Sequence, residues 1–245
     1  MRASEFFSRS EALLGGAAMA RLATARVLVV GVGGVGSWCA EALVRTGLGH
    51  VTLVDDDEVA ASNVNRQCPA TAATIGRAKV EAMAERLAAI NPGCEIEAVN
   101  ARYPSSSVSC LKSFDVIVDA IDSVDCKAEL ILGATEAGVP LVSSMGAALR
   151  VDPTKVRVTR FEKVEGDGLA RALRQRFKKL GRFPTAKFAC VWSAERPGLL
   201  NTETQRHGEG DQGVKAKGSV MPVTATFGMC LASEAIGILT KGDKE

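Results

Sequence analysis

The sequence lacks any pair of cysteines close enough to share a metal or a redox bond. Its seven cysteines stand at positions 39, 68, 94, 110, 126, 190 and 230, and none lies within 15 residues of the next. This spacing excludes the C-x-x-C motifs of zinc sites and of thioredoxin-like proteins. An odd, scattered set is typical of a reducing compartment, where most thiols are buried. We therefore expect a cytoplasmic protein.

Aromatic residues and net charge are also scarce. Aromatics make up 4% of the chain, and the formal net charge is +2. These values exclude a globally basic or stacking-based nucleic-acid binder, so any nucleic-acid surface must be a local patch. The first sixteen residues carry charges throughout and lack the apolar centre of a signal peptide. Pro222, Gly228 and Glu234 interrupt the apolar stretch 220–240, where we expect a core strand followed by a helix and no stable membrane insertion.

Apolar, β-branched segments alternate with amphipathic ones along the first 146 residues. Short helices are expected over residues 4–24. Predicted strands at 26–31, 50–55, 95–100, 114–122 and 140–146 alternate with predicted helices within 36–49, 76–93 and 126–138. This order predicts an α/β fold, with a Rossmann-like, mostly parallel sheet covered by helices.

The pattern changes near residue 148. Residues 148–161 predict two strands around an Asp-Pro turn, residues 168–181 a basic helix, and residues 201–218 a long polar loop. We expect a single domain. Residues 7–148 would form a nucleotide-binding core, and residues 149–245 an extension on the substrate side that adds antiparallel strands and the basic helix.

A glycine-rich turn follows the first predicted strand. Gly31, Gly33 and Gly36 fit G-x-G-x-x-G, and Asp55 follows Gly36 by nineteen residues. In such a unit the amides at a helix N-terminus face a phosphate and the acid holds a ribose hydroxyl. The pattern predicts nucleotide binding but does not separate NAD from ATP.

Polar residues after later strands favour ATP. Arg66, in the turn SNVNRQ, is suited to bidentate phosphate contact, and Lys79 begins the next predicted helix. Asp119 and Asp122 end the fourth strand, at the edge that all parallel strand ends share, so they would face the glycine turn. There Asp122 is suited to hold Mg²⁺. Each residue has a plainer alternative, a solvated cation or a helix cap.

These segments resemble a known superfamily. GVGGVGSWCAEALVRTGLGHVTLVDDDEVAASNVNRQ, IGRAKVEAMAERLAAINP and DVIVDAIDSVDCKAELI are similar to the ubiquitin-activating-enzyme-like (ThiF/MoeB-type) adenylyltransferases, which cleave ATP at the α-phosphate to adenylate a carboxylate. DPTKVRVTRF, LARALRQRFKKLG, CVWSAERP and MPVTATFG resemble the tRNA threonylcarbamoyladenosine dehydratase branch. Members that activate sulfur carriers usually have two C-x-x-C zinc pairs, which this chain lacks.

The resemblance implies ATP and Mg²⁺, and a tRNA whose threonylcarbamoyladenosine lies beside the anticodon. Adenylation of its threonyl carboxylate would lead to dehydration and ring closure. A homodimer is implied too, and a sulfur-transfer protein is a possible partner. The implied catalytic residues are Arg9 (reaching across the dimer), Arg66, Lys79 and the metal ligand Asp122; the implied nucleotide-binding residues are Gly31, Gly33, Gly34, Gly36, Asp55, Asp57, Asn63 and Gln67.

A run of cations near the basic helix points to tRNA without the resemblance. Residues 168–194 contain no acid. A like-charge run is usually a solvated face, but in a nearly neutral chain it favours phosphate contact. Phe177 and Phe183 are expected to anchor this segment in the core. The candidate tRNA-binding residues are Arg171, Arg174, Arg176, Lys178, Lys179 and Arg182, with Lys187 in the same run.

Three alternatives stay open at this point. The first is adenylation of the C-terminal glycine of a ubiquitin-like sulfur carrier. The second is a nucleotide-binding scaffold without catalysis, and the third an NAD oxidoreductase. Some members of the superfamily use a cysteine as a nucleophile or sulfur acceptor, and Cys190 matches a family position. No companion base is evident, so a buried thiol is favoured. His207 is too isolated to assign.

Overall fold

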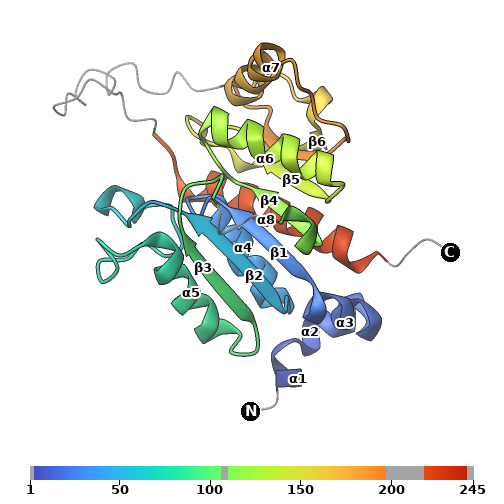
Figure 1. Ribbon diagram of the computed structural model, residues 1–245. Helices are drawn as coiled ribbons and strands as arrows, with labels where there is room; N and C mark the ends of the chain where they lie inside the picture. Colours follow the sequence, from blue (N-terminus) through green and yellow to red (C-terminus); the bar gives the residue numbers. More distant parts are fainter. Residues whose placement is uncertain (1–2, 106–109, 197–217, 242–245) are drawn as a thin grey trace.

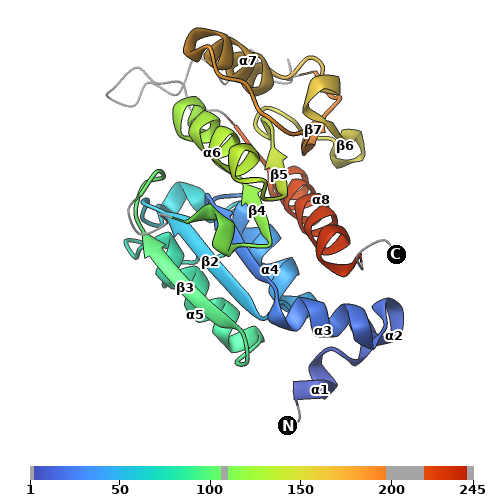
Figure 2. The same ribbon diagram turned by 45° about the vertical axis from the view of Figure 1, so that its right-hand side comes forward.

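The chain forms a seven-stranded sheet between two layers of helices (Figure 1 and Figure 2). The computed structural model describes residues 3–105, 110–196 and 218–241. The strand order is β3-β2-β1-β4-β5-β7-β6, and every neighbouring pair is parallel except β6 and β7. This confirms the predicted α/β, mostly parallel fold.

The elements follow the predicted order. The strands are β1 Arg26–Val30, β2 His50–Asp55, β3 Glu95–Asn100, β4 Val116–Asp119, β5 Leu141–Ser144, β6 Val156–Arg160 and β7 Ala189–Ser193. The helices are α1 Ala3–Phe6, α2 Ser8–Leu14, α3 Gly16–Thr24, α4 Gly36–Thr46, α5 Lys79–Ile90, α6 Val124–Ala137, α7 Gly168–Leu180 and α8 Met221–Thr240, with 3-10 turns η1 Ala61–Asn63, η3 Leu111–Ser113, η4 Pro153–Lys155 and η5 Phe161–Lys163.

Each face of the sheet has its own core. Val27 and Val29 of β1 pack with residues of α4, α5 and α8, including Leu43, Met83 and Phe227. Leu28 and Val30, with the opposite orientation, pack with residues of α6 and α7 on the other face. Because successive side chains of a strand point to opposite faces, a continuous apolar strand such as β1 must be covered on both.

The strand order reverses between β1 and β4. β1 leads through α4 to β2 on one side, while β4 leads through α6 to β5 on the other. At such a switch point the two crossovers diverge beyond the carboxyl ends of the strands and leave a crevice. This position places the glycine turn after β1 opposite the turn after β4.

Two local predictions are wrong. Residues 220–240 do not form a strand and a helix: α8 is one helix, with Pro222 in its first turn, where a missing N–H costs nothing. Its Gly228 lies against α4, where an added Cβ would stand 2.6 Å from the Val35 carbonyl oxygen. Residues 148–152 form no strand either, because Leu149 adopts a left-handed φ of 62° and the Asp152 carboxylate caps η4.

Helix α8 is long and apolar enough to cross a membrane by length and composition. In this fold one side of it lies in the core: Val223, Phe227, Leu231 and Ala235 are buried. The predicted loop over residues 201–218, with His207, lies outside the described residues apart from Gly218.

Candidate active site

A cleft of about 830 Å³ opens at the carboxyl edge of the sheet, at the switch point. Its walls come from the glycine turn, the segment 54–57, the turn 63–67, the segments after β3, β4 and β5, and the start of α7. A smaller cavity of about 420 Å³ lies beside Arg26, His50 and Glu95, at the amino ends of their strands. It contains none of the predicted site residues.

The glycine turn has the close packing that its sequence predicts. Gly31 has a φ of 92°, and a Cβ there would stand 2.6 Å from the Ala120 carbonyl oxygen after β4. A Cβ on Gly36 would collide with the Gly31 carbonyl oxygen. Gly33 and Gly34 line the cleft at the start of α4. A turn of this kind, between a parallel strand and a helix N-terminus, is a common place for a phosphate to bind.

Asp55 fixes this turn. Its Oδ2 accepts a hydrogen bond of 2.6 Å from the Val32 N–H, and its Oδ1 accepts one of 3.0 Å from Asp57 N–H. Burial raises the pKa of Asp55, and the nearby Lys79 offsets part of that rise. The Lys79 ammonium lies 2.6 Å from Asp57 Oδ2 and 3.9 Å from Asp55 Oδ1. Lys79 thus lies in the cleft, as predicted, but its ammonium is held by the two acids.

The turn after η1 brings three predicted residues to the cleft: Asn63, Arg66 and Gln67. Asn63 uses its Oδ1 to accept the Ala60 N–H. Gln67 is 7% exposed, and its Oε1 has no hydrogen-bond partner among the residues that the structure describes. A buried amide oxygen without a partner is costly, so this atom is suited to meet a ligand in the cleft.

The two acids after β4 have different surroundings. Asp119 is fully buried and accepts hydrogen bonds from Lys127 Nζ at 2.8 Å and Ser143 Oγ at 2.6 Å. It therefore points into the core, and the expectation that it faces the glycine turn is wrong. Asp122 is exposed in the cleft and makes no hydrogen bond or ion pair within the described parts of the chain. Among the described residues of the cleft, two exposed carboxylates are available for a cation: Asp122, and Asp56, which lies in a close group of acids with Asp55 and Asp57.

The sequence did not point to the groups on the far wall. Arg102 follows β3 at the same edge of the sheet and lines the cleft. Its place just after a strand could have identified it, because ligands bind beyond the carboxyl ends of parallel strands. Arg150 and Asp167 are both buried and form an ion pair of 3.3 Å at this wall. Asp167 also caps α7 by accepting the Ala170 N–H. No pattern in the sequence marks this pair, which depends on how α7 returns to the cleft.

Arg9 lies elsewhere. It is exposed on α2, in the helical segment that precedes β1 at the amino edge of the sheet, and it does not line the cleft. Within one chain the structure does not bring Arg9 to the other predicted residues.

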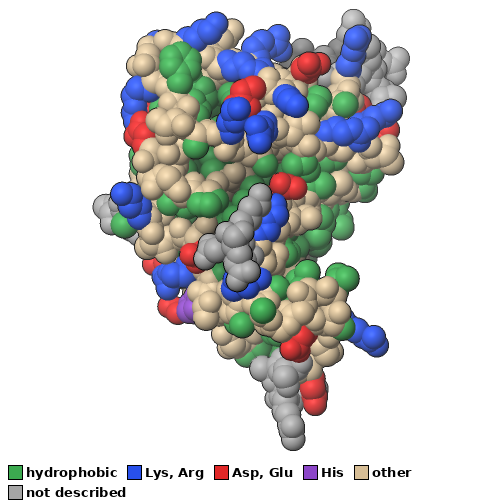
Figure 3. All heavy atoms as spheres, turned by 90° about the vertical axis from the view of Figure 1, so that its right-hand side faces the viewer, with side chains coloured by type: hydrophobic (Ala, Val, Ile, Leu, Met, Phe, Trp, Pro, Cys, Tyr) green, Lys and Arg blue, Asp and Glu red, His purple; other side chains and the backbone are tan. Residues whose placement is uncertain are grey.

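The cations of the α7 segment have two kinds of surroundings. Arg174 donates to the carbonyls of Phe161 and Val164 and lies over the Phe161 ring, while Arg176 pairs with Asp125 and Arg182 with Glu136. Arg171, Lys178, Lys179 and Lys187 are exposed. Figure 3 shows Lys and Arg gathered at the end of the molecule that α7 occupies in Figure 1.

Two side chains of this segment test the sequence expectations directly. Phe177 is 1% exposed and anchors α7, as predicted, whereas Phe183 is 58% exposed and anchors nothing.

Cys190 is fully buried in β7, and burial raises the pKa of its thiol. This burial agrees with the expectation of an unreactive thiol.

Comparisons with known proteins agree on one family. The chain matches the ThiF family over residues 7–245. It is 38% identical to the tRNA threonylcarbamoyladenosine dehydratase of Escherichia coli K12, covering 94% of this chain and 91% of that protein. The crystal structure of the E. coli enzyme in complex with ATP matches with a TM-score of 0.84 at 37% identity, covering 96% of this chain and 94% of that one. The molybdopterin-synthase adenylyltransferase of Salmonella typhimurium is 39% identical over only 64% of this chain and 61% of its own length.

Proposed function

The chain belongs to the ThiF family, and from this we propose that it is an ATP-dependent tRNA threonylcarbamoyladenosine dehydratase. The observation that carries the proposal is coverage. The likeness to the dehydratases extends over nearly the whole chain, α7 and β7 included, whereas the likeness to the sulfur-carrier type of adenylyltransferase covers about two thirds of it.

ATP occupies the cleft with its phosphates at the start of α4. Gly31, Gly33, Gly34 and Gly36 form the phosphate loop, and Asp55 holds the ribose. Arg66 and Lys79 neutralise the phosphates, and Asn63, Asp57 and Gln67 complete the polar lining. Lys79 then exchanges part of its contact with Asp57 for phosphate oxygen.

The reaction has two steps. The threonyl carboxylate attacks the α-phosphate, forming an acyl-adenylate and releasing pyrophosphate. The neighbouring ureido group then attacks the activated carbonyl, closes a ring and expels AMP, so that the nucleoside loses one water in total. An intramolecular attack has a high effective molarity, so no nucleophile from the protein is needed. The protein positions the reactants and stabilises negative charge.

A Mg²⁺ ion fits the donors at this site. Mg²⁺ is commonly held by one or two carboxylates together with substrate phosphates, and Asp122 offers an exposed carboxylate in the cleft. When bound, the ion would neutralise charge on the leaving pyrophosphate.

We further propose a division of labour along the chain. Residues 7–148 carry the ATP site, and residues 149–245 form the substrate side. There the exposed cations Arg171, Lys178 and Lys179 bind tRNA phosphates. Arg174, Arg176 and Arg182 act mainly through the contacts that hold α7 in place. A homodimer in the cytoplasm would allow Arg9 of one protomer to reach the phosphates of the other.

The experiment is AMP formation from ATP and Mg²⁺ with different acceptors. Threonylcarbamoylated tRNA should give AMP, while unmodified tRNA should give none. AMP formed only with a protein that ends in Gly-Gly would instead assign the chain to sulfur-carrier activation.

A further inference from the structure

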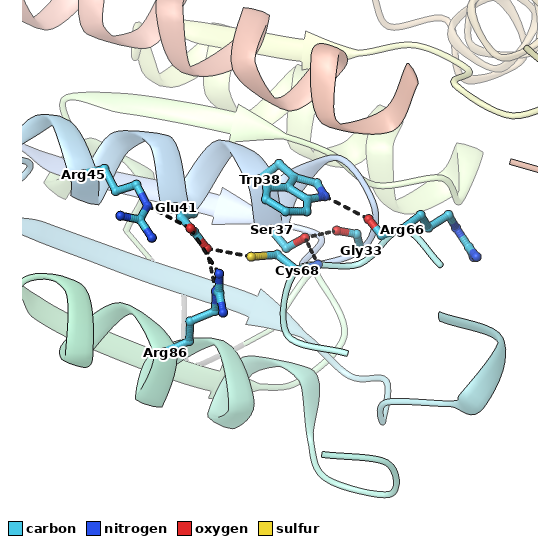
Figure 4. A network of polar contacts seen from close by, with 8 residues as sticks. All are labelled: Gly33, Ser37, Trp38, Glu41, Arg45, Arg66, Cys68 and Arg86. Atoms are coloured by element: carbon cyan, nitrogen blue, oxygen red, sulfur yellow. Dashed lines mark hydrogen bonds and ion pairs between the residues drawn. The ribbon is translucent and has the colours of Figure 1, made fainter. Parts of the chain in front are cut away.

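The turn that carries Arg66 and Gln67 belongs neither to the sheet nor to a long helix. It runs from η1 to Cys68, and its backbone hydrogen bonds are mostly internal, such as those from Arg66 N and Gln67 N to the Asn63 carbonyl. Such a segment needs contacts from outside to keep one orientation. On one side Asn65 Nδ2 donates to the Ser219 carbonyl at 2.9 Å. On the other side three side chains on one face of α4 hold the turn: Ser37, Trp38 and Glu41 (Figure 4).

Ser37 connects the turn to the glycine loop. Its side chain is fully buried, and its hydroxyl donates a hydrogen bond of 2.6 Å to the Gly33 carbonyl. The same hydroxyl oxygen accepts the Cys68 N–H at 3.1 Å. One side chain thus joins the loop at the start of α4 to the end of the turn.

Trp38 holds the middle of the turn. Its Nε1–H donates a hydrogen bond of 2.9 Å to the Arg66 carbonyl. Figure 4 shows the Arg66 side chain pointing away from this contact and from the rest of the network. Trp38 therefore fixes the Arg66 backbone. The guanidinium donates from Nη1 to the Ser62 carbonyl at 2.9 Å and to Asn65 Oδ1 at 2.8 Å, so it is held within the turn, where Arg66 lines the cleft.

Glu41 anchors the network one turn further along α4. It is 5% exposed and accepts hydrogen bonds from Cys68 Sγ at 2.7 Å, Arg86 Nε at 2.6 Å and Arg45 Nε at 2.8 Å. Burial raises the pKa of the Cys68 thiol to about 12, so at neutral pH the sulfur keeps its proton and donates it. The turn is therefore tied to α4 at Cys68 by both backbone and side chain.

We propose that Ser37 and Trp38 are positioning residues for the phosphates of ATP. They hold the turn 63–68 against the glycine loop at the distance at which Arg66 and Gln67 meet the same phosphates as the loop amides. The turn packs closely on the glycine loop, because a Cβ on Gly34 would stand 3.2 Å from the Arg66 Cγ. The role rests on the ATP site of the proposed function and is independent of the tRNA substrate.

The test compares the affinities of the whole chain for Mg·ATP and for adenosine, which lacks phosphates, by isothermal titration calorimetry. Trp38→Phe removes the indole donor and keeps most of the ring, and Ser37→Ala removes the bridging hydroxyl. In each variant the Kd for ATP should rise about tenfold, the loss expected when a charge-assisted contact to phosphate is misplaced, while the Kd for adenosine stays unchanged.

Two matched variants separate positioning from stability. Trp192→Phe removes the Nε1 hydrogen bond to Thr159 Oγ1, and Ser193→Ala removes the hydroxyl that accepts the Glu195 N–H; neither residue lines the cleft. Both should leave the two affinities as in the wild type. The proposal is overturned if Trp38→Phe and Ser37→Ala keep the wild-type affinity for ATP, if they weaken ATP and adenosine equally, or if the wild type does not prefer ATP. Tight ATP binding without tRNA-dependent AMP would instead count against the dehydratase function alone.

Discussion

Asp119 and Lys127 form an ion pair of 2.8 Å in which both side chains are fully buried. Lys127 also donates to the Ile121 carbonyl at 2.9 Å, and Asp119 accepts the Ile121 N–H at 3.2 Å. The buried pair thus holds the backbone of the turn after β4 at Ile121. Asp122 follows at the exposed end of this turn. Asp119, which the sequence places beside Asp122 at the edge of the sheet, thus supports the turn that carries Asp122.

Replacing one partner of this pair should strongly destabilise the fold. Lys127→Met leaves the Asp119 carboxylate buried without its counter-charge, which typically costs about 3–5 kcal/mol of unfolding free energy. Urea denaturation measures this cost. The control Lys112→Met removes an exposed lysine and should change stability by less than about 0.5 kcal/mol. A similarly small loss in Lys127→Met would contradict the assignment of the pair.

Asp122→Asn should abolish most of the activity without unfolding the protein. The side chain is exposed and makes no hydrogen bond in the described residues, so the melting temperature should stay near that of the wild type. AMP formation should fall about 100-fold or more, because the carboxylate that would hold Mg²⁺ beside the leaving pyrophosphate is lost. Glu81→Gln, which removes an exposed acid on α5 outside the cleft, is the control. Equal turnover in the two variants would remove Asp122 from the site.

Glu41 should make the fold sensitive to acid. Burial raises the pKa of its carboxyl, but hydrogen bonds from Arg86, Cys68 and Arg45 outweigh burial and lower it from 4.5 to about 2. A lowered pKa contributes stability that is present above pH 4.5 and is lost as the pH falls toward 2. The full contribution is about 3 kcal/mol, and roughly half remains at pH 3.

The measurement is the urea-unfolding free energy of the wild type minus that of Glu41→Gln, at pH 7 and at pH 3. The difference should be smaller at pH 3. Glu81→Gln, an exposed acid on α5, should show no such change. A difference for Glu41→Gln that is equal at the two pH values would mean that Glu41 is not held ionised by its partners.

The exposed cations of α7 should contribute to tRNA binding through salt-sensitive contacts. Lys178→Glu should weaken binding and lower the slope of log K against log salt by about one unit, since each neutralised phosphate releases counterions. Filter binding at several salt concentrations measures the slope. Lys112→Glu, an equal change of charge on an exposed residue outside the α7 segment, is the control. Equal slopes for the two variants would exclude the patch around Lys178.

Strand periodicity and the rule for parallel sheets predict most of the architecture and most of the cleft. Gly31, Asp55, Arg66, Lys79 and Asp122 all follow strand ends or open helices at one edge, so local pattern and topology together place them in one cleft. The sequence cannot give the orientation of a side chain at such an edge. In the sequence Asp119 and Asp122 are equally plausible as residues that face the cleft. Their different orientations depend on Lys127, which packs under the turn and pairs with Asp119.

The second half shows where local pattern fails. α8 reads as a strand at its start because Val223 and Thr224 are β-branched, yet packing against α4 overrides that preference. The basic run reads as one cationic surface, but Arg174 is directed toward the carbonyls after β6 by the phase of α7. Arg150 and Asp167 form their ion pair only through tertiary structure, so no spacing in the sequence predicts it.

The most direct test of the central claim follows the oxygen that the reaction removes. Threonylcarbamoylated tRNA is prepared with heavy oxygen in the threonyl carboxylate and is incubated with the chain, ATP and Mg²⁺. The tRNA is then digested to nucleosides, and the masses of the modified nucleoside and of the AMP are measured by mass spectrometry. The account predicts a nucleoside lighter by one water that retains one heavy oxygen, and AMP that has gained the other. Unlabelled AMP, or a nucleoside of unchanged mass, would contradict adenylation of this carboxylate.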